Sequence, residues 1–434
     1  MATFLISTMD ATGHVTPARA VAHSLADRGH TVLWHGFERY RDVIESSGAR
    51  FVAAVHTPSF AQLPPEPEPG LSGAHEAVSV LRRLMVDRMA GQLADYEAIA
   101  EHTPVDAVVV DLCCLGGRAF HDRTGVPWAT LGISPLSVPA PDIPPFGSGR
   151  QPPRTAWGRL ANAAYWRLGS RLMHGLTAAY LQERSTLGLP PLPAGVTAFD
   201  HMISDQLHLQ ASTPSLEFPR RQWPPSVRLI GPLLPPAPDP GSVPLPHWWP
   251  QLREAPAVVH VTQGSIATDP ALLTRPALEG LAELDALIVV TTPQPDRLGS
   301  IPSNTRVSGF VPHSLLLPYV DVVVTNAGYN GVKAALAAGV PLVMAPWGND
   351  QPDVAARVTR IGAGIHLRRR TPAPHQIADA VRHALTDPAL RQAARRIQTE
   401  FAQYPAGDHA AAALADHIRT GNPAHQRPAG SAGP

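Results

Sequence analysis

Two side chains in the first half of the sequence have the chemistry of a general base and its partner. His14 follows an apolar run at residues 3–8, and Asp111 ends another apolar run at residues 105–111. An imidazole with a pKa near ~6.5 accepts a proton at neutral pH, and a carboxylate on its other ring nitrogen fixes the tautomer and stabilises the charged form. The alternative is that His14 is one of 20 histidines and has no chemical role.

A second group of residues is typical of an anion-binding turn. A β-branched run at residues 322–325 leads into a helical pattern at residues 332–338. The turn between them holds two asparagines and two glycines, namely Asn326, Gly328, Asn330 and Gly331. Glycines let the backbone approach a ligand, and the N-terminus of the helix presents unpaired N–H groups and a positive dipole end. The alternative is that these glycines only make a tight connection.

Polar residues also follow two other predicted strands. Gly264 and Ser265 come after the run at residues 258–262, where the glycine allows close approach and the hydroxyl can donate to a phosphate. Asp350 and Gln351 lie in the loop after the run at residues 342–345. In an open α/β sheet, ligands bind at the carboxyl ends of the strands. These loops therefore form a candidate site for two parts of one ligand.

The elements that would position these residues alternate between strand and helix, twice along the chain. The first alternation includes strands at residues 3–8, 31–34, 105–111 and 128–132, with a helix expected to begin at Pro17. The second includes strands at residues 258–262, 286–291, 306–310 and 322–325, with a helix at residues 270–283. Such alternation predicts an α/β protein with two doubly wound parallel sheets.

Composition narrows the class of protein. A chain of 434 residues is too long for one ordinary core, which suggests two domains. Its net charge of +0 does not indicate binding to nucleic acid or electrostatic binding to a membrane. The adjacent Cys113 and Cys114 offer neither a disulfide framework nor a zinc site. No apolar run approaches the ~20 residues of a membrane span, and no signal peptide is recognisable, so we expect no integral membrane segment and a cytoplasmic location.

Two irregular, proline-rich regions interrupt the first alternation, at residues 57–73 and 134–153. Aromatic, amphipathic helical patterns follow the second region. Long insertions in an α/β domain are more often functional than structural. We therefore expect a hydrophobic acceptor site that includes Phe146, Trp157 and Trp166, with simple domain packing as the alternative.

The stretch at residues 322–367 resembles the nucleotide-sugar-binding signature of family 1 glycosyltransferases of the GT-B fold, written HGGxNSxxEA…GVPxxxxPxxxDQ. The sequence matches this signature at Gly328, Asn330, Gly339-Val340-Pro341, Pro346 and Asp350-Gln351. The segment at residues 13–32 is similar to the N-terminal segment of the family. Within that family, the chain looks like the bacterial secondary-metabolite enzymes of macrolide type.

The resemblance implies a role for each matching residue. His14 would be the catalytic base and Asp111 its partner. Phe310, Val311 and His313 fall on the base-binding segment, where the aromatic ring stacks on the nucleobase and the valine backbone pairs with its edge. Asp350 and Gln351 fall on the pair that binds the sugar hydroxyls.

Two signature positions differ from the family. The phosphate-contacting histidine is replaced by Asn326, which can still donate a hydrogen bond, and the ribose-binding glutamate is replaced by Ala334. Because a thymidine nucleotide has no 2′-hydroxyl, loss of that glutamate favours a thymidine over a uridine diphosphate sugar.

The resemblance also implies a domain organisation. We expect an acceptor-binding domain at residues 1–215, a linker at 216–256 and a donor-binding domain at 257–405. A helix at 406–421 would cross back to the first domain, and residues 422–434 would be a disordered tail.

Together these patterns predict an inverting glycosyltransferase that moves a sugar from a nucleotide donor to a hydroxyl of a hydrophobic small molecule, such as a polyketide. No two aspartates are two positions apart, so the metal-binding D-x-D pair is missing and we expect neither metal nor cofactor. Two alternatives remain open: a nucleotide-sugar epimerase of the same fold, and a partner or binding protein that has lost catalysis.

Overall fold

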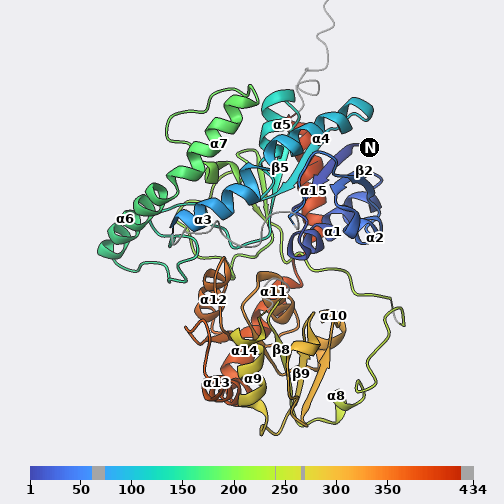
Figure 1. The fold of residues 1–434 in the computed structure, drawn as a ribbon, viewed down its shortest axis with the longest axis vertical. Helices are drawn as coiled ribbons and strands as arrows, with labels where there is room; N and C mark the ends of the chain where they lie inside the picture. Colours follow the sequence, from blue (N-terminus) through green and yellow to red (C-terminus); the bar gives the residue numbers. More distant parts are fainter. Residues whose placement is uncertain (61–73, 240, 265–268, 422–434) are drawn as a thin grey trace, which may run out of the picture.

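The computed structural model describes residues 1–60, 74–239, 241–264 and 269–421, which form two α/β domains (Figure 1). The first sheet has the strand order β3-β2-β1-β4-β5-β6-β7, and the second has the order β10-β9-β8-β11-β12-β13. All neighbouring strands are parallel. The prediction of two doubly wound parallel sheets is confirmed.

The strands are β1 (Thr3–Ser7), β2 (Thr31–Gly36), β3 (Arg50–Ala53), β4 (Ala107–Asp111), β5 (Trp128–Gly132), β6 (Leu207–Gln210), β7 (Val227–Leu229), β8 (Val258–Thr262), β9 (Leu287–Thr291), β10 (Thr305–Ser308), β11 (Val322–Thr325), β12 (Leu342–Met344) and β13 (Gly364–His366). The α-helices are α1 (Thr12–Asp27), α2 (Arg41–Glu45), α3 (Ala74–Leu81), α4 (Met89–His102), α5 (Gly116–Thr124), α6 (Ala156–Leu172), α7 (His174–Thr186), α8 (Gln251–Glu254), α9 (Thr274–Leu281), α10 (His313–Leu316), α11 (Tyr329–Ala337), α12 (Gln351–Arg360), α13 (Pro374–Thr386), α14 (Pro388–Phe401) and α15 (Ala406–Gly421).

The central strands are apolar runs covered on both faces. β4 (AVVVD) and β11 (VVVT) are buried along their whole length. In the first domain α1 and α15 pack on one face of the sheet, and α4 and α5 pack on the other. In the second domain α11, α12 and α14 cover one face, and α9 and α13 cover the other.

In each sheet, successive strands are added toward one edge until one point, after which the chain crosses over and adds strands toward the other edge. In the first sheet this switch lies between β1 and β4, and in the second it lies between β8 and β11. Loops diverge from such a point and leave a crevice at the carboxyl ends of the strands. His14 and Asp111 belong to the first crevice, and Gly264 and Asn326 belong to the second.

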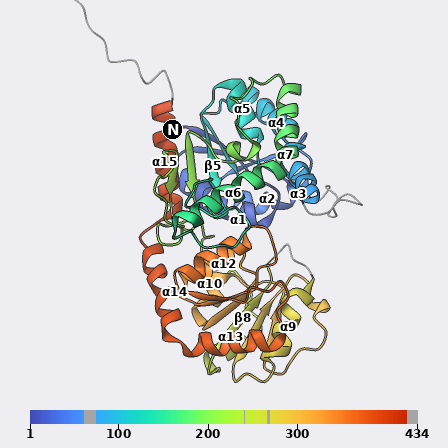
Figure 2. The same ribbon diagram turned by 90° about the vertical axis from the view of Figure 1, so that its left-hand side faces the viewer.

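Helix α15 returns to the first domain after α14 leaves the second (Figure 2). It packs on α1, and its residues Ala410, Ala411 and Leu414 join the core beneath that helix. The contact is close, because a Cβ on Gly407 would lie 2.6 Å from the Ala20 carbonyl oxygen. Residues 422–434, expected to be a disordered tail, lie outside the described residues.

Three sequence expectations need correction. Residues 227–229, expected in the linker, form β7 and pair with β6, so the first domain continues past residue 215. This is an edge strand, where flanking prolines are tolerated. The helix expected at residues 270–283 is the short 3-10 turn Pro270–Leu272 followed by α9.

The third correction concerns the first helix. It begins at Thr12, and Pro17 lies inside it. Proline has no N–H, so the carbonyl of Gly13 lacks the usual donor four residues later. The side chain of Asn330 from the second domain donates to that carbonyl instead, at 2.9 Å.

None of the described helices combines the length and apolar character that crossing a bilayer requires.

Candidate active site

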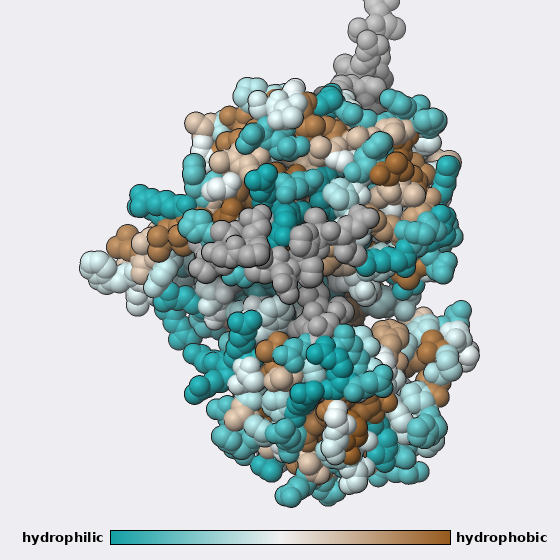
Figure 3. Space-filling view, in the orientation of Figure 1, coloured by the Kyte–Doolittle hydropathy of each residue, from teal (hydrophilic) through white to brown (hydrophobic). Residues whose placement is uncertain are grey.

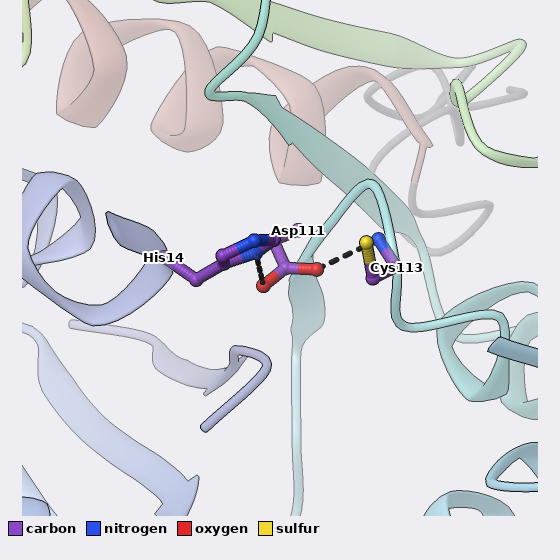
Figure 4. A group of neighbouring side chains, drawn as sticks. All are labelled: His14, Asp111 and Cys113. Atoms are coloured by element: carbon purple, nitrogen blue, oxygen red, sulfur yellow. Dashed lines mark hydrogen bonds and ion pairs between the residues drawn. The ribbon is translucent and has the colours of Figure 1, made fainter. Parts of the chain in front are cut away.

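A cleft of about 2880 Å³ lies between the carboxyl ends of the two sheets. His14, at the start of α1, lines this cleft and contacts Asp111, at the end of β4 (Figure 4). His14 Nδ1 lies 2.9 Å from Asp111 Oδ2, with the imidazole side chain 18% exposed and the carboxylate fully buried. The sequence predicted that these two residues lie close together, and the structure brings them into hydrogen-bond contact.

Backbone groups fix the carboxylate of Asp111. Met9 N–H donates to Oδ2 at 2.6 Å, and Cys113 N–H donates to Oδ1 at 2.7 Å. Burial opposes ionisation of Asp111, but the attraction of His14 and these hydrogen bonds outweigh burial and lower its pKa. Because an ionised carboxylate only accepts hydrogen bonds, Nδ1 of His14 carries the proton and Nε2 has a free lone pair.

The thiol of Cys113 adds a third possible metal ligand to this pair. The ligand atoms of His14, Asp111 and Cys113 lie within 4.8 Å of one another. However, the oxygens of Asp111 already accept hydrogen bonds from three donors. Burial and the nearby carboxylate raise the pKa of the Cys113 thiol, and the thiolate is the form that binds metals. The cluster therefore fits a hydrogen-bonded dyad better than a metal site.

Asn326 holds together the turn after β11. Its side-chain nitrogen donates to the Gln263 carbonyl at 2.6 Å, and its oxygen accepts from Gly328 N–H at 3.1 Å. Asn326 therefore links the loops after β8 and β11. The sequence predicted only a hydrogen bond to a phosphate at this position and did not predict this contact. Gly264 has φ +77, and a Cβ there would lie 3.2 Å from the Asn326 nitrogen, so this position requires glycine.

The N-terminus of α11 opens toward the cleft at the predicted turn. Gly328 precedes the helix, and Gly331 and Asn330 lie in its first turn beside the cleft. Asn330 donates across the cleft to the carbonyl of Gly13, next to His14, while its side-chain oxygen is buried without a partner among the described residues. Ser265, predicted to donate to a phosphate, lies outside the described residues.

The predicted base-binding segment lies along the same wall. Phe310 is 79% exposed at the cleft, so its ring is free to receive a planar ligand, whereas Val311 is buried. His313 begins α10 and contacts the ring of His260 edge to face at 5.8 Å. Burial lowers the pKa of His313, which favours its neutral form.

Asp350 and Gln351 lie at the start of α12 and line the cleft. Burial raises the pKa of Asp350. The side-chain oxygen of Gln351 accepts from Trp347 N–H at 3.1 Å, which orients its amide. Both residues therefore line the same cleft as His14 and the α11 turn.

Two of the three residues predicted to bind the acceptor line the cleft. Phe146 and Trp166 line the cleft, and Trp166 Nε1–H donates to the Ile143 carbonyl at 2.8 Å. Trp157 was wrongly placed at this site. It is 81% exposed on the outer side of α6 and does not line the cleft.

Sequence reasoning missed Asp353, which links the loop at residues 147–149 of the first domain to α12 of the second. Its two carboxylate oxygens accept from Gly147 N–H at 2.7 Å and from Gly149 N–H at 2.9 Å. Gly147 directly follows Phe146, and Gly149 lies two residues further along the chain. No sequence signal pointed to this contact, because its partners are 206 and 204 residues away.

Comparison with known proteins agrees with this geometry. The family described as "Erythromycin biosynthesis protein CIII-like, C-terminal domain" matches residues 275–416. The chain is 38% identical over 404 residues to 4'-demethylrebeccamycin synthase of Lentzea aerocolonigenes, covering 92% of this chain and 95% of that protein. It is 30% identical over 420 residues to UDP-glycosyltransferase 2 of Phaeomoniella chlamydospora, covering 90% of each.

Among solved structures, the glycosyltransferase VinC in complex with dTDP has the same fold. The TM-score is 0.68 at 21% identity, and the match covers 96% of this chain and 100% of that chain. The architecture is therefore that of GT-B proteins. This fold, together with the 38% identity that covers 92% of the chain, shows that the protein is a glycosyltransferase and belongs to family 1 of the GT-B fold.

Proposed function

We propose that the protein transfers a sugar from a nucleoside diphosphate donor, preferably a thymidine one, to a hydroxyl of a hydrophobic natural product. The reaction would be a single inverting displacement without metal or cofactor. The hydrogen-bonded pair of His14 and Asp111 at the cleft is the observation that carries this proposal.

The acceptor hydroxyl would lose its proton to His14 Nε2. The oxygen then bonds to the anomeric carbon as the bond from that carbon to the diphosphate breaks, and the bonding electrons leave with the diphosphate. Attack opposite to the leaving group inverts the configuration. Asp111 would stabilise the imidazolium through the Nδ1 hydrogen bond, since its pKa is lowered and it remains ionised.

The leaving diphosphate would bind at the N-terminus of α11, where backbone N–H groups favour an anion. Gly264, Gly328, Asn330 and Gly331 shape this end of the cleft, and Ser265 remains an expected donor. Asn326 would act mainly by holding the two loops at the right distance. Phe310 and Val311 would bind the nucleobase with His313 beneath them, and Asp350 and Gln351 would bind the sugar hydroxyls.

Ala334 supports the choice of thymidine. It lines the cleft at the position where the family signature has the ribose-binding glutamate. The names of the similar proteins point both ways, since one relative is named for UDP and VinC was solved with dTDP. The missing glutamate favours thymidine, because only a uridine donor would lose a contact with its 2′-hydroxyl.

The acceptor class is supported by the names of the similar proteins and by the cleft itself. One relative is a 4'-demethylrebeccamycin synthase, and the matching family is named for erythromycin biosynthesis. Phe146 and Trp166 would provide apolar contacts to such an acceptor.

Turnover of His14→Ala with a panel of thymidine and uridine diphosphate sugars and natural-product alcohols tests this proposal. A positioned general base contributes a factor of about 10²–10⁴, so the rate should fall by that amount while donor affinity stays near that of the wild type. His102→Ala, an exposed histidine on α4, serves as the matched control. A wild-type protein that binds donor without any turnover would indicate the binding-protein alternative. Conversion of the donor sugar to its epimer without acceptor would indicate the epimerase.

A further inference from the structure

Helix α6 has an apolar face that no other part of the described chain covers. At 100° per residue, Trp157, Leu168 and Leu172 lie on one side of the helix, with Leu160 and Tyr165 on its margins. All five side chains are exposed, Trp157 by 81% and Leu160 by 62%. The opposite side holds α6 in the fold, because Asn162 is buried and Trp166 lines the cleft. In Figure 3, hydrophobic residues gather at the projecting edge where Figure 1 places α6.

The surroundings of this face are strongly basic although the chain as a whole has no net charge. No aspartate or glutamate occurs between Asp142 and Glu183. The same interval contains five arginines, namely Arg150, Arg154, Arg159, Arg167 and Arg171. None of these arginines makes a salt bridge within the described part of the chain. Arg150 lies over the ring of Tyr165, 4.5 Å from its centroid. The balanced total charge therefore hides a local cationic surface.

We propose that α6 docks the enzyme on the surface of an anionic lipid bilayer. An interfacial helix carries Trp and Leu on one face and Arg or Lys beside them, and it lies in the membrane plane with its apolar face among the headgroups. Trp and Tyr favour this depth because their rings are amphipathic. The unpaired arginines supply the attraction to lipid phosphates.

A second copy of the chain fits this surface less well. Two α6 helices in contact would bring their arginines together without acidic residues to neutralise them. The helix also projects from the edge of the molecule, where it faces the viewer in Figure 2, and so presents a ridge to a flat surface.

Docking would place the acceptor side of the cleft beside the membrane. Trp166 on α6 and Phe146 on the preceding loop line the cleft, while Trp157 and Leu168 would contact lipid. An apolar acceptor dissolved in the bilayer interface would then have a short path to the active site. This last step rests on the proposed acceptor class, whereas the docking itself does not.

The test is co-sedimentation of the full chain with vesicles, which requires no turnover. Vesicles of phosphatidylcholine mixed with phosphatidylglycerol should bind the protein at least about tenfold more tightly than pure phosphatidylcholine, and added salt should weaken binding. Leu168→Ser/Leu172→Ser and, separately, Arg167→Glu/Arg171→Glu should each lower the partition coefficient by about tenfold or more.

Arg382→Glu/Arg396→Glu is the matched control, because it changes the net charge equally on α13 and α14 of the other domain. It should bind vesicles much better than the Arg167 and Arg171 variant. Unchanged melting temperature and thymidine diphosphate affinity would show that each variant is folded. Failure of the wild type to bind mixed vesicles at low salt would overturn the proposal, as would equal losses in the control. So would a concentration-dependent dimer that the leucine variant abolishes, because the face would then bind a second copy.

Discussion

Replacing Lys333 with methionine should stabilise the protein at neutral pH and change how its stability depends on pH. Lys333 is the only lysine in the chain. It lies fully buried on α11, and among the described residues its amine has no hydrogen-bond partner. The amine lies over the ring of Tyr329, 4.3 Å from its centroid. Methionine keeps most of the apolar stem and removes the charge.

The size of the effect follows from the pKa of this amine. Burial lowers the pKa of Lys333 from 10.5 to about 7, although Asp350 and Glu217 favour the charged form. Each pKa unit corresponds to ~1.4 kcal/mol, so at pH 7 this shift destabilises the fold by on the order of 4 kcal/mol. Between pH 7 and 10.5 the unfolded amine binds more protons than the native one, so wild-type stability rises with pH. At pH 9 the penalty should have fallen to about 2 kcal/mol.

Urea unfolding of the wild type and of Lys333→Met, at intervals from pH 6 to 9.5, measures this directly. The free-energy advantage of the variant should be greatest below pH 7 and should shrink by about 2 kcal/mol by pH 9. Arg382→Met, an exposed cation on α13, is the control and should show no such trend. An advantage of Lys333→Met that stays constant over this range would refute the reasoning, because the native amine would then keep its ordinary pKa.

Four further outcomes are expected. Asp111→Asn should lower kcat by about 10²–10⁴ with little change in donor KM, because an amide cannot stabilise the imidazolium of His14; an unchanged kcat in steady-state assays would exclude a working dyad. Activity should persist after dialysis against EDTA, and a loss reversed only by Mg²⁺ or Mn²⁺ would show that metal is needed. Calorimetry should give tighter binding of thymidine than of uridine diphosphate, and Ala334→Glu should strengthen uridine diphosphate binding by roughly tenfold or more through a charge-assisted hydrogen bond. Asp353→Asn should raise acceptor KM severalfold and leave donor affinity unchanged, because it weakens the hold on Gly147 and Gly149; an equal effect on both substrates would contradict this role.

The sequence predicted those parts of the site whose residues directly follow the carboxyl end of a strand. His14 and Asp111 could be paired because parallel strands of one sheet end at the same edge, whatever the helices between them do. The α11 turn was recognisable for the same reason, since Gly328 and Gly331 lie directly between a strand and a helix. Element order and the positions of the special residues suggested these contacts, and the resemblance to family 1 glycosyltransferases strengthened them.

Contacts that depend on orientation or on the other domain could not be predicted. Trp157 and Trp166 occupy one amphipathic helix, and the sequence alone does not tell which side faces the cleft. The sequence predicted that the Asn326 amide could donate to a phosphate, but nothing in it indicated that this amide also donates to the Gln263 carbonyl. Asp353 binds partners that are 206 and 204 residues away in the sequence, and the Lys333 amine has no hydrogen-bond partner among the described residues. No local sequence pattern identifies either residue.

Helix α15 reverses the order in which the two domains can be completed during synthesis. The strands of the second sheet come from one continuous stretch, from β8 to β13, and the last helix that covers this sheet, α14, ends at Phe401, before α15 begins. The core under α1 still lacks Ala410, Ala411 and Leu414 at that time. The domain that leaves the ribosome first is therefore the last to close. Until α15 arrives, the apolar side of α1 stays open to water and to chaperones, and a chain that ends between Phe401 and Ala406 holds a complete second domain attached to an unfinished first domain.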